Sequence, residues 1–324
     1  MLRVGVWGVG TWGEKHARIW RALSGPEIEL IGIFDRRPER AAEIAKAHGC
    51  EAFASAEAML RRVDALSIAV PTVEHRAAAE QALAAGCHVL VEKPLAVTTA
   101  EADAMLAAAK QAGRTLQVGQ VERFNPALVA VRDRIVAPKF IEAHRLAVFQ
   151  PRSLDIDVVF DLMIHDIDIV LQIVGQPPES VSGVGVQVLS VNEDIANARL
   201  EFPDGCVANL TASRVSQERL RRIRFFQSDS YVSVDLFERR CDVLKVEAKG
   251  APPTSIEQAL QSIRRATIEA PEGEPLTLEL RAFADHLLGR GAGAASGWAG
   301  REALRVAEDV RAAMRRRSLQ WTAR

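Results

Sequence analysis

Asp161 precedes His165 by four residues in the apolar segment DVVFDLMIHDIDIVLQIVG, residues 157–175. On a helix, this spacing puts the carboxylate within reach of the imidazole. A carboxylate there orients the ring and stabilises its protonated form, as in a general base held by an acid. The pair therefore predicts proton transfer. Metal binding is the second chemistry open to Asp and His, but no nearby His or Cys completes a zinc set, and we expect no metal.

The same segment predicts a helix with two stripes. Its core stripe would be Phe160, Ile164, Ile167, Leu171 and Val174, and its polar stripe Asp157, Asp161, His165 and Asp168. A solvated face is the alternative for the polar stripe. Two features argue against a solvated face. Between Arg152 and Glu179 the only ionisable residues are Asp and His, whereas solvated helix faces usually carry Lys, Glu and Arg. In addition, like charges four residues apart weaken a helix. A substrate, a distant lysine or a metal would offset that repulsion, and Asp166 is expected to bind an N–H group or an arginine.

A glycine-rich turn separates the first predicted strand from the first predicted helix. It reads Gly8-Val9-Gly10-Thr11-Trp12-Gly13, the G-x-G-x-x-G spacing in which the helix N-terminus receives a pyrophosphate. Asp35 ends the next predicted strand, where an acid accepts hydrogen bonds from ribose hydroxyls and repels a 2′-phosphate. Arg36 and Arg37 follow and could pair with such a phosphate or lie in a solvated loop. We expect NAD rather than NADP; a glycine turn without a ligand is the alternative.

Lys93 lies in the sequence Val91-Glu92-Lys93-Pro94, directly after a predicted strand. The carboxyl ends of parallel strands are where ligands of such folds bind. A lysine there can hydrogen-bond a sugar hydroxyl and stabilise charge developing on its oxygen. On local sequence alone, a plain surface lysine is the alternative.

The two halves of the chain follow different patterns. Up to about residue 120, predicted strands at 2–8, 29–35, 64–71, 88–94 and 115–120 alternate with helices at 12–23, 38–49, 73–86 and 98–113, which implies a doubly wound parallel sheet. The later strands, at 140–150, 180–190, 196–202, 206–214, 223–227, 231–236 and 242–248, lack crossover helices between most of them and predict an open, mostly antiparallel sheet. Helices are expected at 276–288 and 301–317. We predict an α/β protein with domains 1–121 and 122–324, whose C-terminal helices may return to the first domain.

Composition excludes several classes of function. The 324 residues carry a net charge of −1, so no bulk field attracts nucleic acid or an anionic membrane. The four cysteines, Cys50, Cys87, Cys206 and Cys241, lie outside metal-motif spacing and suggest a reducing cytosol. No apolar run reaches the roughly 18 residues of a membrane span. A strand predicted from about Arg3 would leave no room for a signal peptide.

Polar residues of the second half have two readings each. Arg123 and Asn125, in VERFNPA, either contact a substrate or tie the halves together. Excess positive charge in the second half comes from Arg152, Arg214, Arg219, Arg221, Arg222 and Arg224. A solvated strand edge is the default for the last five of these arginines, although a diphosphate-bearing substrate would use one or two of them.

With these residues assembled, the chain resembles the Gfo/Idh/MocA oxidoreductases, the glucose–fructose oxidoreductase and inositol dehydrogenase family. The resemblance rests on VGVWGVGTWGEKHAR, IAVPT at residues 68–72, HVLVEKPLA and DLMIHDID. It implies a nicotinamide-binding Rossmann domain followed by an α/β domain whose open sheet pairs subunits into homodimers or homotetramers. The implied catalytic residues are Lys93, Asp161 and His165. Cofactor contacts fall on Gly8, Gly10, Thr11, Trp12, Gly13, Asp35, Arg36, Pro71, Thr72, Glu92 and Lys93, and substrate contacts on Lys93, Gln120, Arg123, Asn125, Arg152 and His165.

Within that family, VGQVERFNPAL, LDIDVVFDLMIHDIDIV and DIANARLEFPDGCVANLTASRVS are most similar to the sugar-nucleotide 3-dehydrogenases. This implies NAD-dependent oxidation of the 3-hydroxyl of UDP-N-acetylglucosamine, a step that feeds 3-amino sugars into lipid A. His165 would accept the hydroxyl proton, Asp161 would hold the imidazole, and Lys93 would hydrogen-bond the reacting oxygen. Gln120 departs from the subgroup's usual histidine. A free sugar or inositol as substrate, and a non-catalytic NAD(H)-sensing regulator, are the alternatives.

Overall fold

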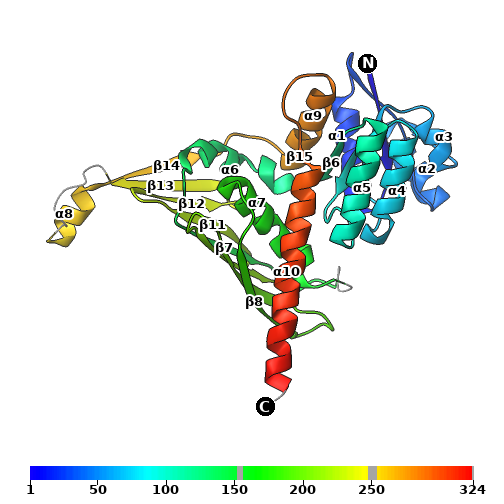
Figure 1. The fold of residues 1–324 in the computed structure, drawn as a ribbon. Coiled ribbons are helices and arrows are strands. Elements are labelled where there is room, and N and C mark those ends of the chain that lie inside the picture. The colour runs from blue at the N-terminus through cyan, green and yellow to red at the C-terminus, as the bar shows by residue number, and fades with distance from the viewer. Residues whose placement is uncertain (152–155, 247–253, 323–324) are drawn as a thin grey trace. The chain divides into compact units, whose positions relative to one another are not determined.

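The computed structural model describes residues 1–151, 156–246 and 254–322. The chain forms two compact units (Figure 1). The first contains residues 1–124 and 274–305, and the second contains residues 125–273 and 306–324. The segment 274–305, which the sequence analysis placed in the second domain while allowing its helices to return, therefore belongs to the first unit.

The first unit is built on a seven-stranded sheet of order β15-β6-β5-β4-β1-β2-β3. Six strands are parallel, and β15 pairs antiparallel with β6. The chain order reverses beside β1, which is the switch point where ligands of such sheets bind. The strands are β1 (Leu2–Trp7), β2 (Ile28–Phe34), β3 (Glu51–Ala52), β4 (Ala65–Ile68), β5 (His88–Glu92), β6 (Leu116–Gly119) and β15 (Ala295–Ser296).

Helices cover this sheet, as a run of apolar parallel strands requires. They are α1 (Thr11–Leu23), α2 (Pro38–His48), α3 (Ala56–Leu60), α4 (Thr72–Ala84), α5 (Thr99–Ala112) and α9 (Pro275–Leu287). Helix α9 packs on α1, where the Trp20 and Phe283 rings meet edge-on at 6.5 Å. The predicted doubly wound sheet is confirmed.

Capping residues define the ends of two helices of the first unit. Pro38 begins α2, and Gly49 ends it in the left-handed conformation at φ 60°. Thr98 caps α5 by accepting a hydrogen bond from the Glu101 N–H, and Gly113 ends that helix at φ 62°. These residues fix the loops that follow the strands, where the site residues lie.

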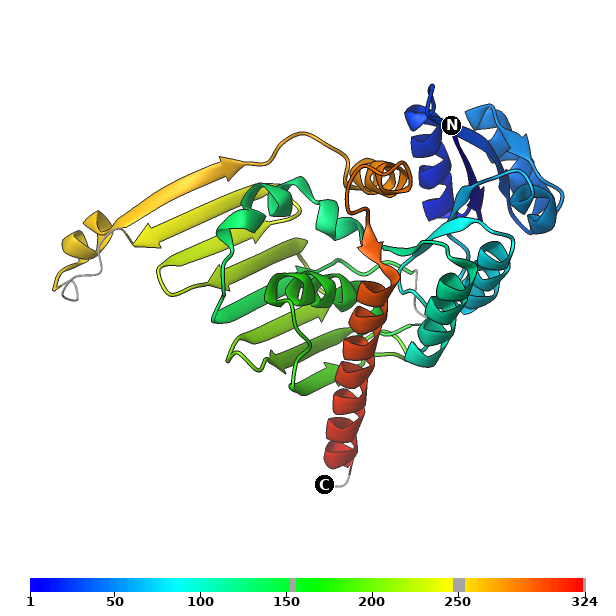
Figure 2. The ribbon, with the colours of Figure 1, turned by 45° about the horizontal axis from the view of Figure 1, so that its top comes forward.

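The second unit is an eight-stranded sheet of order β14-β13-β12-β11-β7-β10-β9-β8 (Figure 2). All its pairs are antiparallel except β7 with β10. The predicted open, mostly antiparallel sheet is confirmed. Its strands are β7 (Phe140–Leu146), β8 (Ser180–Val186), β9 (Ile195–Glu201), β10 (Val207–Ser213), β11 (Leu220–Phe226), β12 (Ser230–Asp235), β13 (Arg240–Val246) and β14 (Ile263–Glu269).

Alternating side chains give this sheet one buried face. In β9, for example, Ala196, Ala198 and Leu200 are buried, while the residues between them are exposed. The helical elements of the unit are α6 (Pro126–Val131), η2 (Arg132–Arg134), η3 (Val159–Met163), α7 (Ile164–Val174), α8 (Ile256–Gln261) and the later part of α10 (Gly297–Thr322), while η1 (Val121–Phe124) ends the first stretch of the first unit. Figures 1 and 2 show α6 and α7 on one side of the sheet, and no helix among the described residues of this unit covers its other face.

A hairpin with the turn residues Pro203, Asp204 and Gly205 joins β9 and β10. Gly205 adopts φ +82°, and its N–H donates to the Phe202 carbonyl at 2.9 Å. The sequence analysis missed β3, α3, α6, α8, β14 and β15. Strand β14 is exposed along nearly its whole length, so it lacks the apolar alternation that reveals a half-buried strand.

Candidate active site

The glycine turn between β1 and α1 has the geometry that its spacing predicts. Gly8 adopts φ +86°, a conformation that other residues rarely adopt. A Cβ atom on Gly13 would lie 1.8 Å from the Gly8 carbonyl oxygen, so this residue must be glycine for α1 to approach the turn. A Cβ atom on Gly10 would meet nothing within 4 Å, which leaves open space beside the backbone. No side chain caps α1, so its first N–H groups can receive an anion.

Asp35 is buried directly beside this turn. Its Oδ2 accepts the Val9 N–H at 2.8 Å, and its Oδ1 accepts the Arg37 N–H at 2.9 Å and the Arg37 Nε–H at 3.1 Å. Burial alone would raise the pKa of this carboxyl, but the hydrogen bonds from Arg37 and Val9 outweigh it and lower the pKa. Asp35 is therefore ionised at neutral pH, as its predicted ribose-binding role requires.

A cavity of about 360 Å³ lies over the turn. Its lining includes seven predicted cofactor residues: Gly8, Gly10, Thr11, Trp12, Asp35, Arg36 and Pro71. Gly13, Thr72, Glu92 and Lys93 are not in its wall. The lining residues that the cofactor prediction omitted are Trp7, Arg37, Ala69, Val70 and Glu74. Glu74 pairs with Arg36 at 2.7 Å, so the charge of Arg36 is already balanced.

Lys93 follows β5 at the carboxyl end of the sheet, and the Lys93–Pro94 peptide bond is cis. Glu92 accepts the Lys93 N–H at 3.2 Å through Oε2, while its Oε1 lies 2.9 Å from Nε2 of buried His16 on α1. The helix after the glycine turn is thus joined to the strand end that carries Lys93.

His75 of α4 holds the other side of the Lys93 turn. Its Nδ1 lies 2.9 Å from the Pro94 carbonyl oxygen, and its Nε2 lies 3.0 Å from the Val70 carbonyl oxygen. Burial lowers the pKa of His75, so the ring favours its neutral form. We interpret His75 as a structural residue that links the segments following β4 and β5.

Gln120 and Asn125 lie near the end of the first unit and the start of the second. Gln120 is buried, and its Oε1 has no hydrogen-bond partner among the described residues. Asn125 caps α6 by accepting the Ala127 N–H at 3.1 Å and donates to the Leu236 carbonyl at 3.0 Å. The Asn125 side chain therefore holds the second unit together locally, which the sequence alone could not decide. Arg123 is half-buried on η1.

The segment predicted as one helix over 157–175 is interrupted. Residues 159–163 form a π-helical turn, η3, before α7 begins at Ile164. Such turns widen the helix locally and recur at functional sites. Of the predicted polar stripe, Asp157 and Asp168 are buried, and Asp161 and His165 are half-buried. The stripe is therefore no solvated face. Contact between Asp161 and His165 stays a prediction.

Two aspartates of this segment have structural partners. Asp157 Oδ1 accepts the Val159 and Phe160 N–H groups at 3.0 and 3.2 Å, which starts the π-helical turn. Burial raises the pKa of Asp157. Asp166 binds Arg145 of β7 through two hydrogen bonds of 2.9 and 2.7 Å. The expectation that Asp166 binds an N–H group or an arginine is confirmed.

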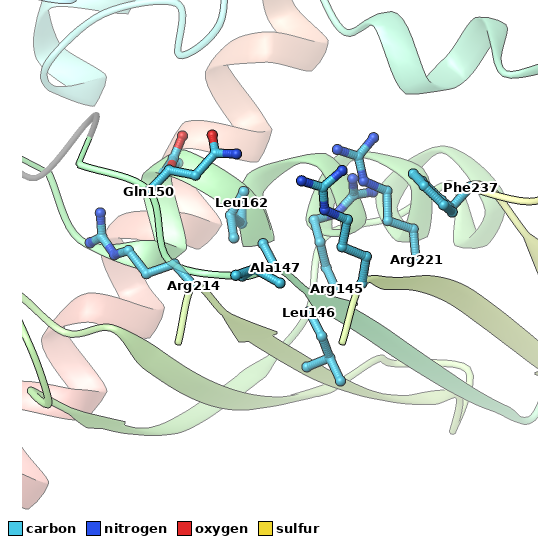
Figure 3. Close-up of a pocket in the computed structure, with 11 residues that line it drawn as sticks. Arg145, Leu146, Ala147, Gln150, Leu162, Arg214, Arg221 and Phe237 are labelled. Atoms are coloured by element: carbon cyan, nitrogen blue, oxygen red, sulfur yellow. The ribbon is translucent and has the colours of Figure 1, made fainter. Parts of the chain in front are cut away.

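A second cavity, of about 160 Å³, lies in the second unit (Figure 3). Asp161 and Leu162 of η3 form part of its wall, and four arginines contribute most of its charge. Those arginines are Arg145, Arg214, Arg219 and Arg221. Arg152, a predicted substrate residue, lies outside the described residues.

Over the described part of the chain, no group of three or more His, Cys, Asp or Glu side chains could hold a metal ion. None of the helices described combines the length and the apolar character needed to cross a membrane. All four cysteines are free.

Comparison with known proteins follows the same two-part division. Residues 2–120 match the model of an oxidoreductase family with an NAD-binding Rossmann fold, and residues 142–232 match the GFO/IDH/MocA C-terminal domain. The chain is 40% identical to the UDP-N-acetylglucosamine 3-dehydrogenase of Acidithiobacillus ferrooxidans, over 97% of each protein. It is 29% identical to the trans-1,2-dihydrobenzene-1,2-diol dehydrogenase of Sus scrofa, over 67% of this chain and 69% of that enzyme.

Solved structures agree. The Acidithiobacillus ferrooxidans UDP-N-acetylglucosamine 3-dehydrogenase superposes with a TM-score of 0.88 at 39% identity, over 96% of this chain and 97% of that one. A levoglucosan dehydrogenase in complex with NADH and levoglucosan superposes with a TM-score of 0.84 at 19% identity, over 97% of each chain, and so shares the fold.

Proposed function

Because the chain belongs to the Gfo/Idh/MocA family of NAD-binding oxidoreductases, we propose that it oxidises the 3-hydroxyl of UDP-N-acetylglucosamine with NAD. The observation that carries this substrate is the 40% identity to an enzyme of that name over 97% of both proteins. A family member acting on a free sugar or inositol would share the glycine turn and Lys93, so these two features do not select the substrate.

The proposed cofactor site is the cavity over the glycine turn. NAD, when bound, supplies the hydride-accepting chemistry. The open side of Gly10 and the uncapped start of α1 suit a pyrophosphate, and ionised Asp35 suits ribose hydroxyls and disfavours a 2′-phosphate. In this proposal residues 1–121 hold the dinucleotide and residues 122–324 hold the substrate.

Proton handling is assigned to three side chains. His165 accepts the proton of the substrate hydroxyl, and Asp161, four residues earlier, orients the imidazole and stabilises its protonated form. Lys93 donates a hydrogen bond to the same oxygen and stabilises the charge that develops there. Gln120, whose buried Oε1 lacks a described partner, and Arg123 are proposed to contact the sugar. Asn125 contributes by fixing the start of α6.

The open face of the eight-stranded sheet is the proposed interface between subunits. Phe140, Phe226 and Tyr231 form an aromatic cluster on it, with ring centroids 5.0–5.5 Å apart. Arg224 and Glu142 add an ion pair of 2.8 Å beside that cluster. A large aromatic surface with a polar surround is typical of protein interfaces. We expect a homodimer or homotetramer, which sedimentation of the purified protein would test.

The proposed product, a 3-keto sugar nucleotide, is a substrate for transamination, so we propose a place in the supply of 3-amino sugars for lipid A. We also propose a cytosolic location. Its support is the four free thiols, three of them buried, for which burial raises the pKa to about 11.

Purified protein with NAD and UDP-N-acetylglucosamine deuterated at C3 tests the proposal. We expect NADH to appear with deuterium in the reduced nicotinamide, because the C3 hydrogen is the one removed. Matched substrates deuterated at C4 should transfer none. Turnover of inositol or glucose in place of the sugar nucleotide would favour the free-sugar alternative. Tight NADH binding without turnover of any of these would favour a regulator.

A further inference from the structure

Two consecutive arginines in the wall of the cavity over the glycine turn are each bound to a carboxylate. Arg37 donates to Asp35 through its Nε–H at 3.1 Å. Arg36 donates through Nη1 to Glu74 at 2.7 Å, across 38 residues of sequence. Glu74 lies in the first turn of α4, so this pair joins the loop after β2 to the start of α4.

The ionisable side chains in the described wall of this cavity balance one another. They are two arginines, Arg36 and Arg37, and two acids, Asp35 and Glu74. The 2′-phosphate of NADP would bring up to about two negative charges to a wall that has no net positive charge. The ribose hydroxyls of NAD are uncharged and need no such compensation. The wall as a whole, and not Asp35 alone, therefore suits NAD better than NADP.

Arg36 has the position of a residue that binds a 2′-phosphate. It directly follows the acid after β2, and an arginine near that acid accommodates the phosphate in folds of this kind. Its side chain is 72% exposed, and Glu74 is its ion-pair partner among the residues that the structure describes. A guanidinium released from this carboxylate could bind phosphate oxygens through two parallel hydrogen bonds. Glu74 therefore decides whether Arg36 is available to a ligand.

A second ion pair of α4 shows what a pair without a place in the cavity looks like. Glu80 binds Arg76 of the same helix at 2.8 Å, and the Glu80 side chain is 36% exposed, close to the 38% of Glu74. Neither Glu80 nor Arg76 lies in the cavity wall. Glu74 differs because its arginine comes from another element and because both members of its pair line the cavity.

We propose that Glu74 is a specificity-determining residue that excludes NADP by holding the guanidinium of Arg36. The carboxylate occupies the cation that a 2′-phosphate would need, in addition to the repulsion exerted by Asp35. The inference rests on the proposed cofactor site and does not depend on the identity of the sugar. It makes the coenzyme preference a property of two segments of the chain, the loop after β2 and the first turn of α4.

Glu74→Gln tests the proposal, with Glu80→Gln as the matched control on the same helix. The neutral amide accepts a weaker hydrogen bond from Arg36 than the carboxylate does, so the guanidinium becomes available to a phosphate. Fluorescence of the reduced nicotinamide gives the Kd for NADH and for NADPH without any sugar present. The ratio of the NADPH Kd to the NADH Kd should fall by about 10-fold or more in Glu74→Gln. It should stay within about twofold of wild type in Glu80→Gln.

The same titrations in an Arg36→Gln background test whether Glu74 acts through Arg36. Without the guanidinium, adding Glu74→Gln should change the Kd ratio by less than about twofold, because there is no cation left to release. An equal fall of the ratio in both backgrounds would overturn the proposal, since Glu74 would then act by repulsion alone. An exposed ion pair contributes little to folding stability, so all of these variants should fold, which circular dichroism checks.

Asp35→Asn separates this inference from the proposed cofactor site. If Asp35→Asn lowers the Kd ratio but Glu74→Gln matches Glu80→Gln, the role of Glu74 is wrong and the cofactor site stands. If neither Asp35→Asn nor Glu74→Gln changes the Kd for either nucleotide, the cavity over the glycine turn does not hold the coenzyme, and the proposed site fails together with the inference.

Discussion

Arg145 and Asp166 form a fully buried ion pair in which Nε and Nη2 of the arginine bind the two carboxylate oxygens at 2.9 and 2.7 Å. The pair joins the central strand β7 to α7, the helix that carries His165. Arg3 and Asp64 form a pair of the same geometry, with bonds of 3.0 and 2.6 Å, but their side chains are 45% and 36% exposed. The chain therefore contains a buried pair and its exposed counterpart.

Asp166→Asn should destabilise the protein by about 3 kcal/mol or more, because it leaves a buried guanidinium without its counter-charge. Asp64→Asn, the matched exposed variant, should cost about 1 kcal/mol or less because solvent screens that pair. Urea unfolding followed by circular dichroism would measure both. Equal losses in the two variants would show that burial of the Arg145–Asp166 pair has no special role.

Lys93→Ala and His165→Ala should each lower kcat by about 10² to 10⁴, the contribution of a positioned proton-transfer group or charge stabiliser. The Kd for NADH should change little, since neither side chain lines the cavity over the glycine turn. NADH fluorescence and steady-state rates provide the two measurements. Lys110→Ala, at an exposed position of α5, serves as the control. Near-wild-type turnover would remove the substituted residue from the proposed chemistry.

Asp35→Asn should shift coenzyme preference toward NADP by about 10-fold or more in kcat/KM, about 1.4 kcal/mol. The amide keeps an acceptor for the Val9 N–H but removes the charge that repels a 2′-phosphate, and Arg37 then lacks its carboxylate partner. Parallel rate measurements with NAD and NADP test this. Glu39→Gln removes a charge from the first turn of α2, outside the cavity, and should leave the preference unchanged.

Sequence reasoning was strongest where a single residue type is required by local geometry. Gly8 and Gly13 are predictable because a positive φ and an interatomic distance of 1.8 Å exclude every other residue. Pro38 and Gly49 mark the ends of α2 for similar reasons. Each of these signals depends on the backbone alone, which is why most strands and helices of the first unit could be predicted, although β3, α3 and β15 were missed.

Reasoning failed where distant parts of the chain decide the structure. That Asp166 needs a cation was predictable, but Arg145 lies 21 residues away on another element, and no spacing rule identifies it. The π-helical turn at 159–163 was not predicted. Such a turn holds one residue more than an α-helical turn, and the apolar residues of this segment recur at positions that fit either kind of turn. Likewise, α9 packs on α1 through Phe283 and Trp20, a contact that only tertiary structure reveals.

Asp194 is a buried carboxylate of the second unit that accepts several hydrogen bonds. Its Oδ2 accepts the Val188, Leu189 and Ser190 N–H groups at 2.7–2.9 Å, and its Oδ1 accepts the Ser190 hydroxyl at 2.7 Å. Burial acts to raise the pKa of this carboxyl, but these hydrogen bonds prevail and lower its pKa to about 2. The loop between β8 and β9 therefore depends on an ionised Asp194.

Stability conferred by Asp194 should be lost in acid. Its pKa is lower in the folded protein than in the unfolded chain, so its contribution is complete above about pH 4 and disappears as the pH falls through about 2. The Asp194→Asn variant should be less stable than wild type by about 2 kcal/mol at pH 7, and the difference should shrink steadily below about pH 4. Urea unfolding of both proteins across this pH range measures the difference in their free energies of unfolding. Because the two proteins share all other titrating groups, the contribution of those groups cancels in this difference. Exposed Asp133, changed to Asn, should give a small and constant difference. A gap between wild type and Asp194→Asn that stays the same down to pH 2 would mean that the hydrogen bonds do not require the charged carboxylate.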